Sequence, residues 1–185
     1  MKKREIKIVN FLYLDEKKYN KILEYRNQEY IRKVSINENI ISKKEHKDYL
    51  ELLKKKDKYF SFLIIINKKD YGVISLKKIT EDTYSIGDYL VKEEYKFEGG
   101  GIVNRICLSY IASKLNIKYL KSKQLIDNTR GNRLGGVKTI EVIRCENSDF
   151  NEIKAVVDNF YDESIINSKS RMLFDKLYDI KDCQI

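Results

Sequence analysis

The sequence of 185 residues has no proline, no tryptophan, one histidine, three cysteines and eight glycines. It also has no apolar run of the ~20 residues that a bilayer-crossing helix requires, so we expect no membrane span. The cysteines, Cys107, Cys145 and Cys183, are odd in number and lack the spacing of metal ligands. We therefore predict no metal site, and reduced thiols in a cytoplasmic protein. The absence of proline, together with many Lys, Ile and Asn residues, fits a skewed genome composition and indicates no function.

The composition is that of a globular protein, with 42% hydrophobic and 35% charged residues. A surplus of 37 basic over 28 acidic residues gives a formal net charge of +9. Such a charge suits a polyanion, and nucleic acid, an anionic membrane surface and a phosphorylated small molecule are all polyanions. The charges are scattered, however, and the 14 tyrosines are not concentrated on one basic element. We therefore predict neither a nucleic-acid partner nor a membrane partner.

Hydrophobic periodicity predicts an order of strand, two helices, three strands, helix, strand, loop and strand. Asp15 is placed to cap the first helix, and Ser42-Lys-Lys-Glu45 forms a capping box for the second. The expected strands are 6–14, 59–66, 71–79, 84–91, 118–126 and 137–144, and the expected third helix is 102–115. Cys107 lies on the apolar face of that helix, where we expect a small core residue.

The last part of the chain, 148–185, has helical periodicity at Ile153, Val156, Val157 and Phe160, then at Met172, Phe174 and Leu177. We predict a helical C-terminal extension (148–185) packed on a domain of residues 1–147. The fold class predicted is α+β, with a central, mainly antiparallel mixed sheet flanked by helices.

Three of the eight glycines stand side by side, between a predicted strand and a predicted helix. The first amides of a helix have no partner within it, and the helix dipole adds positive potential there, so Gly99–Gly101 could hold a phosphate. Lys96 could add a full positive charge. The pattern is neither GxxxxGK[ST] nor GxGxxG after a buried parallel strand, so it predicts neither a P-loop nor a Rossmann site.

Lys96-Phe-Glu-Gly99-Gly100-Gly101 resembles the acyl-CoA loop of the GNAT N-acetyltransferases, Gln/Arg-x-x-Gly-x-Gly/Ala. The element order resembles theirs too, over about residues 6–144. The resemblance implies the GNAT fold, acetyl-CoA as cosubstrate, and a pantetheine arm that pairs with the edge of the fourth strand. It further implies that the amides of Leu90 and Val91 polarise the thioester carbonyl. The implied CoA-binding set is Leu90, Val91, Lys96, Gly99, Gly100, Gly101, Ile102 and Asn128.

Within that superfamily, the sequence is similar to the acetyltransferases of UDP-linked 4-amino-4,6-dideoxy sugars in pseudaminic acid biosynthesis. The similar segments are 24–27 with His46, 72–78, and 87–89. The resemblance implies a nucleotide-sugar pocket lined by Arg26, His46, Lys77 or Lys78, and Tyr89. The residues alone allow another reading, in which Arg26 extends from an apolar stripe to solvent and His46 is a core histidine.

One position departs from the superfamily. A tyrosine that protonates the departing thiolate usually lies seven residues after the asparagine at the position of Asn128, but Gly135 stands there. A different group or water could serve instead, activity could have been lost, or the local alignment could be shifted.

We expect a cytoplasmic N-acetyltransferase that moves acetyl from acetyl-CoA to an amine of a nucleotide-linked amino sugar, by direct attack. The catalytic positions are Leu90, Val91 and Asn128. The alternatives are a peptide N-terminal or polyamine acetyltransferase on the same scaffold, and a catalytically inactive CoA- or nucleic-acid-binding module. A homodimer is left open.

Overall fold

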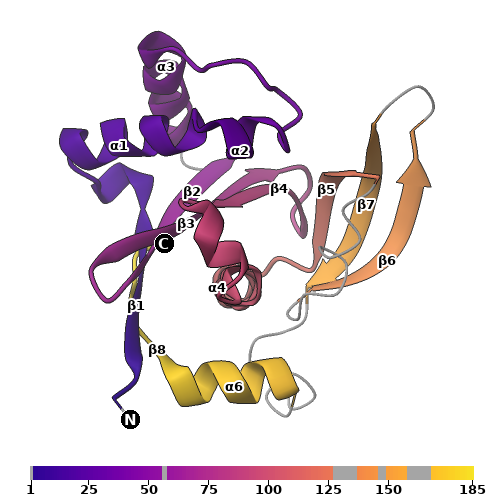
Figure 1. The fold of residues 1–185 in the computed structure, drawn as a ribbon. Helices are drawn as coiled ribbons and strands as arrows, with labels where there is room; N and C mark the ends of the chain where they lie inside the picture. Colours follow the sequence, from indigo (N-terminus) through magenta and orange to yellow (C-terminus); the bar gives the residue numbers. More distant parts are fainter. Residues whose placement is uncertain (1, 56–57, 127–136, 146–148, 158–167) are drawn as a thin grey trace.

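A computed structural model describes residues 2–55, 58–126, 137–145, 149–157 and 168–185. Its eight strands form one sheet in the order β6-β7-β5-β4-β3-β2-β1-β8 (Figure 1). The strands are β1 (Arg4–Asn10), β2 (Tyr59–Ile66), β3 (Lys69–Lys78), β4 (Thr83–Leu90), β5 (Tyr119–Leu125), β6 (Val137–Arg144), β7 (Phe150–Val157) and β8 (Tyr178–Cys183). The helices are α1 (Glu16–Arg26), α2 (Glu29–Arg32), α3 (Lys43–Lys54), α4 (Gly100–Lys114) and α6 (Lys169–Leu177), with 3-10 turns η1 (Phe11–Tyr13) and η2 (Glu93–Lys96).

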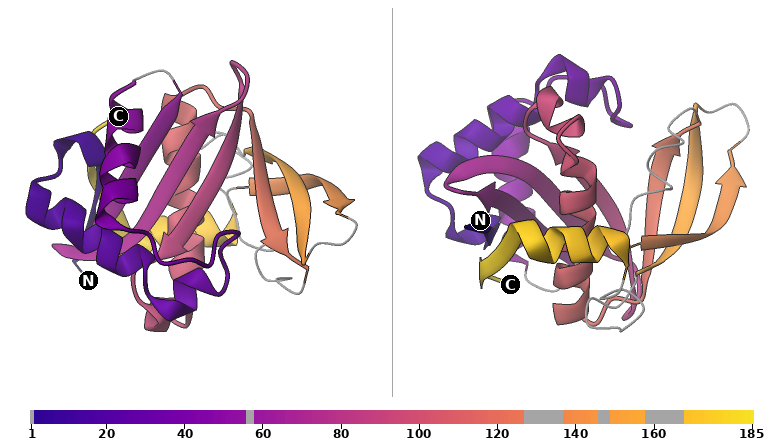
Figure 2. Two further views of the ribbon diagram at one scale, coloured as in Figure 1. Left: turned by 90° about the horizontal axis from the view of Figure 1, so that it is seen from above. Right: turned by 60° about the horizontal axis from the view of Figure 1, so that its bottom comes forward.

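The sheet is mainly antiparallel, as predicted. Only the β4–β5 and β1–β8 pairs run parallel among the pairs described. Helices α1, α2 and α3 cover one face, and α4 and α6 lie on the other (Figures 1 and 2). The α+β class with a mixed sheet flanked by helices is confirmed.

Local signals determine where the N-terminal helices begin. The side chain of Asp15 accepts a hydrogen bond from the Lys18 amide, which satisfies one of the orphan donors of α1. Ser42 and Glu45 form both halves of the capping box of α3. Both helix starts are as predicted. The first strand, however, ends at Asn10, and the next residues form the turn η1.

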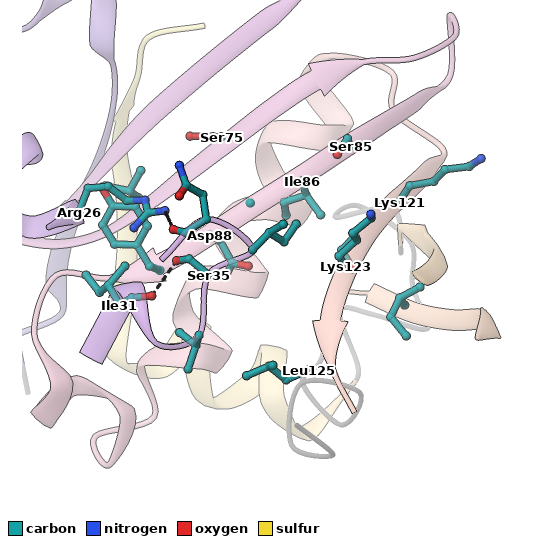
Figure 3. A pocket seen from close by; sticks show the side chains of 18 of the residues that line it. Arg26, Ile31, Ser35, Ser75, Ser85, Ile86, Asp88, Lys121, Lys123 and Leu125 are labelled. Atoms are coloured by element: carbon teal, nitrogen blue, oxygen red, sulfur yellow. Dashed lines mark hydrogen bonds between the residues drawn. The ribbon is translucent and has the colours of Figure 1, made fainter. Parts of the chain in front are cut away.

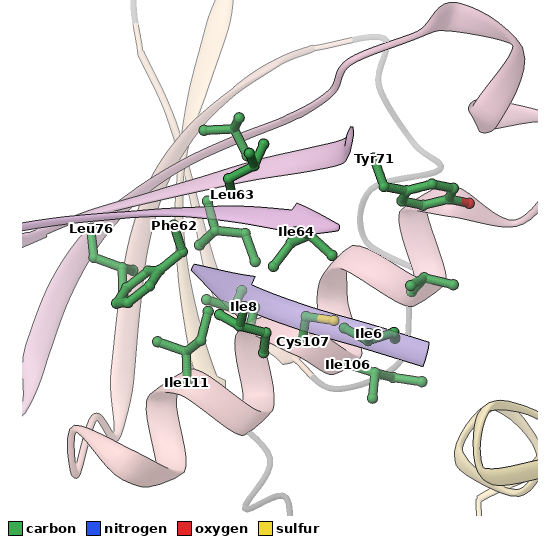
Figure 4. Close-up of a cluster of buried hydrophobic side chains, with 14 of the residues drawn as sticks. Ile6, Ile8, Phe62, Leu63, Ile64, Tyr71, Leu76, Ile106, Cys107 and Ile111 are labelled. Atoms are coloured by element: carbon green, nitrogen blue, oxygen red, sulfur yellow. The ribbon is translucent and has the colours of Figure 1, made fainter. Parts of the chain in front are cut away.

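One part of the hydrophobic core lies between the sheet and α4 (Figure 4), and the same buried cluster includes Tyr19, Ile22 and Leu53 of α1 and α3. Ile8, Phe62 and Ile64 from the sheet and Ile111 from α4 are fully buried. Cys107 is also fully buried, and burial raises the pKa of its thiol far above the ordinary value. The thiol is therefore protonated and packs as a small apolar group, as predicted.

The prediction of a helical tail is correct only for α6. Residues 150–157 were predicted to be helical and form β7, which pairs with β5 on one side and β6 on the other. Residues 178–183 form β8, which pairs with β1. Ile153 and Ala155 are buried in β7, two residues apart as in a strand. Other apolar residues nearby hide this alternation in the sequence. The predicted helical position Phe160 lies outside the described residues.

Candidate active site

A gap in the sheet separates β4 from β5. The two strands pair only where Thr83, Tyr84 and Ser85 face 119–121. Beyond Ser85, β4 continues to Leu90 with no partner strand on that edge among the described residues, and β5 turns away with β7 and β6 (Figure 1). A cavity of about 990 Å³ occupies this region. That is at the upper end of the ~300–1,000 Å³ typical of ligand pockets.

The cavity is bounded by elements from both sides of the gap. Figure 3 shows Arg26 on α1, Asp88 on β4, and Lys121 and Lys123 on β5. Its basic side chains are Arg26, Arg105, Lys121, Lys123 and Lys154, and its acidic ones are Glu45, Asp88, Glu141 and Glu152. The lining described therefore has no acidic surplus.

The hydrogen-bond pattern of β4 distinguishes the two predicted carbonyl-polarising amides. The Val91 amide donates to the Tyr71 carbonyl of the β3 side at 3.0 Å. In an antiparallel ladder, adjacent residues direct their amides to opposite edges, so the Leu90 amide is directed at the gap. The Leu90 carbonyl, on the same edge, accepts a hydrogen bond from the Tyr30 hydroxyl at 2.7 Å. Of the two predicted amides, only that of Leu90 is available to a ligand in the gap.

The glycine segment opens α4, as predicted. Gly99 is the N-cap residue with φ of 80°, a left-handed conformation that glycine adopts without strain. The Ile102 amide already donates to the Gly99 carbonyl at 3.0 Å, so the helix has only the preceding glycine amides to offer an anion. At Gly100, a Cβ atom would lie 2.6 Å from the Tyr95 carbonyl oxygen. Close packing within the protein therefore requires that glycine.

The ammonium of Lys96 contacts an acidic side chain and an aromatic ring. Its ammonium lies 3.5 Å from a Glu93 carboxylate oxygen and 5.0 Å from the centre of the Tyr30 ring. The Lys96 and Glu93 side chains are both largely exposed, so this ion pair contributes little to stability.

Arg26, one of the predicted substrate-binding residues, has a buried hydrogen-bond donor without an acceptor among the described residues. Its Nη2 donates to the Asn37 carbonyl at 3.0 Å, but Nη1 is buried and has no hydrogen-bond partner in the part of the chain described. Burial lowers the pKa of the guanidinium and raises that of the Tyr89 phenol, which also lines the cavity. A buried donor without an acceptor is costly, so Nη1 is suited to an anionic or carbonyl oxygen of a ligand.

His46 lines the cavity but is held by the protein itself. Its Nε2 lies 2.9 Å from the Tyr19 carbonyl oxygen, and its ring stacks on the Tyr19 ring at 4.0 Å between centroids. Because a carbonyl only accepts, this contact places the proton on Nε2. Burial lowers the pKa of the imidazole. The geometry favours a neutral, structural histidine, with only Nδ1 left for a ligand.

Lys77 and Lys78 do not line the cavity. The Lys77 ammonium lies 5.8 Å from the centre of the Tyr59 ring, and Lys78 pairs with Glu81 at 2.8 Å. On β3, the cavity is lined by Val73 and Ser75 instead. Two other predicted positions, Asn128 and Gly135, lie outside the described residues.

Sequence reasoning missed several residues of the site. Tyr30 lies on α2, a single-turn helix that the hydrophobic pattern does not reveal. Asp88 lies on the part of β4 whose β5-side edge is unpaired among the described residues, and the Asn104 amide donates to it at 3.3 Å. Asn104 packs so closely on Gly72 that a Cβ there would lie 2.4 Å from Oδ1. A buried polar residue in the apolar stripe of α4 was the one signal available.

No group of side chains suited to a metal ion occurs among the residues that the structure describes. None of the described helices is long and apolar enough to cross a membrane.

Solved structures share this architecture. The N-acetyltransferase PseH of Campylobacter jejuni, in complex with acetyl coenzyme A, is 22% identical over 80% of this chain and 96% of its own, with a TM-score of 0.57. Spermidine N-acetyltransferase of Vibrio cholerae, with CoA and spermine bound, has a TM-score of 0.69 at 11% identity, over 85% of this chain and 98% of its own. The chain has the GNAT acetyltransferase fold.

The fold is shared with acetyltransferases of diverse acceptors. The structure of AAC(6')-Ib with an aminoglycoside and acetyl-CoA has a TM-score of 0.67 at 11% identity, over 89% of this chain and 99% of its own. No family model matches the sequence, and no curated protein matches it. Likeness at such identities establishes the GNAT fold, and function is argued from the site.

Proposed function

We propose that the protein is an acetyl-CoA-dependent N-acetyltransferase whose acceptor is an amine of a nucleotide-linked amino sugar. The observation that carries the proposal is the gap beside β4. It combines an unpaired strand edge, the Leu90 amide directed into it, and a glycine-opened helix next along the chain. Pantetheine can pair with such an edge as an added strand would, and its pyrophosphate can bind at the start of α4.

The reaction follows from these parts. A neutral amine attacks the thioester carbonyl carbon, a C–N bond forms, and the C–S bond breaks as the tetrahedral intermediate collapses. The Leu90 N–H is positioned to stabilise the oxyanion of that intermediate. The amine loses its proton to water or a cavity carboxylate, and the thiolate leaves with the bonding electron pair. A thiolate of pKa near ~8.5 leaves readily near neutral pH, so the absence of tyrosine at position 135 is tolerable.

The acceptor class is supported by charge. The unpartnered Nη1 of Arg26 suits an anionic or carbonyl oxygen, as in a diphosphate or a uracil ring. A polyamine would instead require an excess of carboxylates, and the described lining has five basic against four acidic side chains. The resemblance of segments 24–27, 72–78 and 87–89 to acetyltransferases of UDP-linked amino sugars is a second reason to choose an amino sugar.

The test is free-thiol release from acetyl-CoA with a panel of UDP-amino sugars, aminoglycosides, polyamines and peptides. We expect turnover on at least one UDP-amino sugar, with the highest kcat/KM of the panel. Faster turnover of a polyamine or a peptide would show that the acceptor is of that class and not a nucleotide-linked amino sugar. CoA binding without turnover on any acceptor would identify a binding module instead.

Arg26 can be tested against a matched control. Arg26 and Arg32 both donate to backbone carbonyls of the loop before α3, at Asn37 and Glu38 respectively, but only Arg26 lines the cavity. We expect Arg26→Gln to raise the KM for the UDP-amino sugar at least tenfold, with an unchanged Kd for CoA, because a charge-assisted contact contributes about 1.5–3 kcal/mol. Arg32→Gln should leave the KM within about twofold. Equal changes in KM for the two substitutions would show that Arg26 acts by stabilising the loop before α3 and not by binding the substrate.

A further inference from the structure

Three hydroxyl groups form a continuous chain beneath the cavity. The Tyr49 hydroxyl lies 2.7 Å from Ser61 Oγ, and Ser61 Oγ lies 2.9 Å from Ser75 Oγ. Ser61 is fully buried, whereas Tyr49 and Ser75 both line the cavity. We call these three residues the hydroxyl chain. It is a polar link between α3, β2 and β3 that is buried at Ser61 and reaches the cavity at both ends.

The hydroxyl chain has an unused hydrogen-bonding capacity. Each hydroxyl has one proton, so three protons serve two internal contacts. If the protons point from Tyr49 to Ser75, Ser75 has a donor left for the cavity and Tyr49 has a free acceptor. If they point the other way, the roles of the two ends are exchanged. In either direction, the chain offers one donor and one acceptor to a ligand, and the contacts strengthen one another.

Gly87 lies directly opposite Ser75 on β4, with its missing side chain on the same face of the sheet. Glycine weakens a strand interior, so its presence needs a reason. The backbone requires none, because Gly99 is the one described glycine with positive φ. Packing requires none either, since a Cβ at Gly87 would have no heavy atom of the described chain within 4 Å. The space belongs to the cavity, which Ser85, Gly87 and Tyr89 all line.

We propose that a hydroxylated ring of the acceptor lies over Gly87 and hydrogen-bonds to the hydroxyl chain through Ser75. This inference rests on the proposed function and specifies how the acceptor is recognised. A side chain at position 87 would project between those of Ser85 and Tyr89 and would keep a ring from contacting the sheet. Ser75, the cross-strand neighbour of Gly87, is then within reach of a ring hydroxyl. Figure 3 shows Ser75 on β3 and Ser85 on β4, the strand to which Gly87 also belongs. A sugar provides such a ring with hydroxyls, and an unbranched polyamine provides neither.

The first experiment fills the space over Gly87. Gly87→Val introduces a residue that strands favour, into open space, so the melting temperature should stay equal or rise. The KM for a UDP-amino sugar should rise at least about tenfold through lost approach, while the Kd for acetyl-CoA stays within about twofold. Gly87→Ala should give a smaller rise in KM. Normal KM in a stable Gly87→Val variant would overturn the inference.

The second experiment removes the hydrogen bond. Wild-type protein and Ser75→Ala are compared on a UDP-amino sugar and on its monodeoxy analogues. We expect the wild type to reject one analogue by roughly tenfold in kcat/KM, and Ser75→Ala to lose that preference. Ser113→Ala is the control, because its hydroxyl donates to the Tyr110 carbonyl within α4, outside the cavity lining.

The outcomes separate the two proposals. If the wild type discriminates against no analogue, or if Ser75→Ala keeps the discrimination, the hydroxyl subsite is wrong and the acetyltransferase function stands. If the wild type acetylates no UDP-amino sugar, the proposed acceptor class fails, and the subsite fails with it.

Discussion

At the scale of single residues, His46 shows how a side chain can lie in a cavity wall and still be occupied by the protein. It is the one histidine of the chain, and its Nε2–H is used by the Tyr19 carbonyl. The Tyr19 hydroxyl in turn donates to the His46 carbonyl at 2.6 Å. These reciprocal bonds join α1 to α3. A substrate role for His46 is therefore restricted to Nδ1.

The lowered pKa of His46 predicts a pH dependence of stability. The ordinary value is 6.5, and burial lowers it in the folded state. The unfolded chain then binds the proton more tightly, so the stabilisation is fully present above about pH 6.5 and is lost as the pH falls through that value toward the folded pKa. In chemical denaturation between pH 7.5 and 5.5, wild-type stability should fall more than that of His46→Gln, which cannot titrate. If the free energy of unfolding falls equally with pH in both proteins, the pKa of His46 is the same in the folded and unfolded states.

At the scale of elements, the backbone geometry at the start of α4 supports the proposed binding of the CoA pyrophosphate there. Gly99 adopts the left-handed conformation, and its missing Cβ has no described neighbour within 4 Å. Gly100, by contrast, is enclosed by the Tyr95 carbonyl and the Leu90 side chain. A substitution at Gly100 would disturb packing before it tested binding, so Gly99 is the informative position.

A charge pair at Gly99 tests whether α4 binds the CoA pyrophosphate. Asn and Asp tolerate the left-handed conformation better than other side chains and have nearly the same shape. Gly99→Asp should therefore differ from Gly99→Asn chiefly by one negative charge. We expect the Asp variant to bind CoA about tenfold more weakly than the Asn variant in calorimetry, which corresponds to ~1.4 kcal/mol of repulsion near the surface. Equal affinities would place the pyrophosphate elsewhere.

At the scale of the whole molecule, the sheet consists of two parts that, among the described residues, pair only through Thr83–Ser85 of β4 and residues 119–121 of β5. One part is β8 with β1 to β4, packed on α4, and the other is β5, β7 and β6. The cavity takes residues from both parts, so a ligand in the gap would connect them. The net charge of +9 favours anionic ligands in general. Under the proposed function, the shape of the gap would determine which of them bind.

Thermal unfolding can separate acetyl-CoA from a generic polyanion. A ligand that binds only the folded state stabilises it by about 2.7 kcal/mol at a concentration of 100 Kd. We expect acetyl-CoA to raise the melting temperature at physiological salt. A DNA duplex at equal phosphate concentration should have little effect, because scattered charges are screened within about 8 Å. A larger shift with DNA than with acetyl-CoA would favour the nucleic-acid alternative.

Most of the architecture could be predicted from local sequence, because local interactions determine it. The caps at Asp15 and Ser42 and the bounds of β2 and β6 match the structure. The strand β7 was missed because its pairing partners, rather than its own periodicity, decide its state. Tyr30 was missed because a four-residue helix leaves too short a pattern.

The sequence by itself determined that α4 starts at a glycine cluster after β4, since positive φ and unpaired helix amides are local properties. Only the tertiary structure decided which groups remain free for a ligand. It showed that Tyr71 uses the Val91 amide, that Tyr19 uses the His46 ring, and that Lys77 and Lys78 lie outside the cavity. Whether a donor is satisfied depends on residues distant in the chain, and a side chain's type and spacing do not specify its partner.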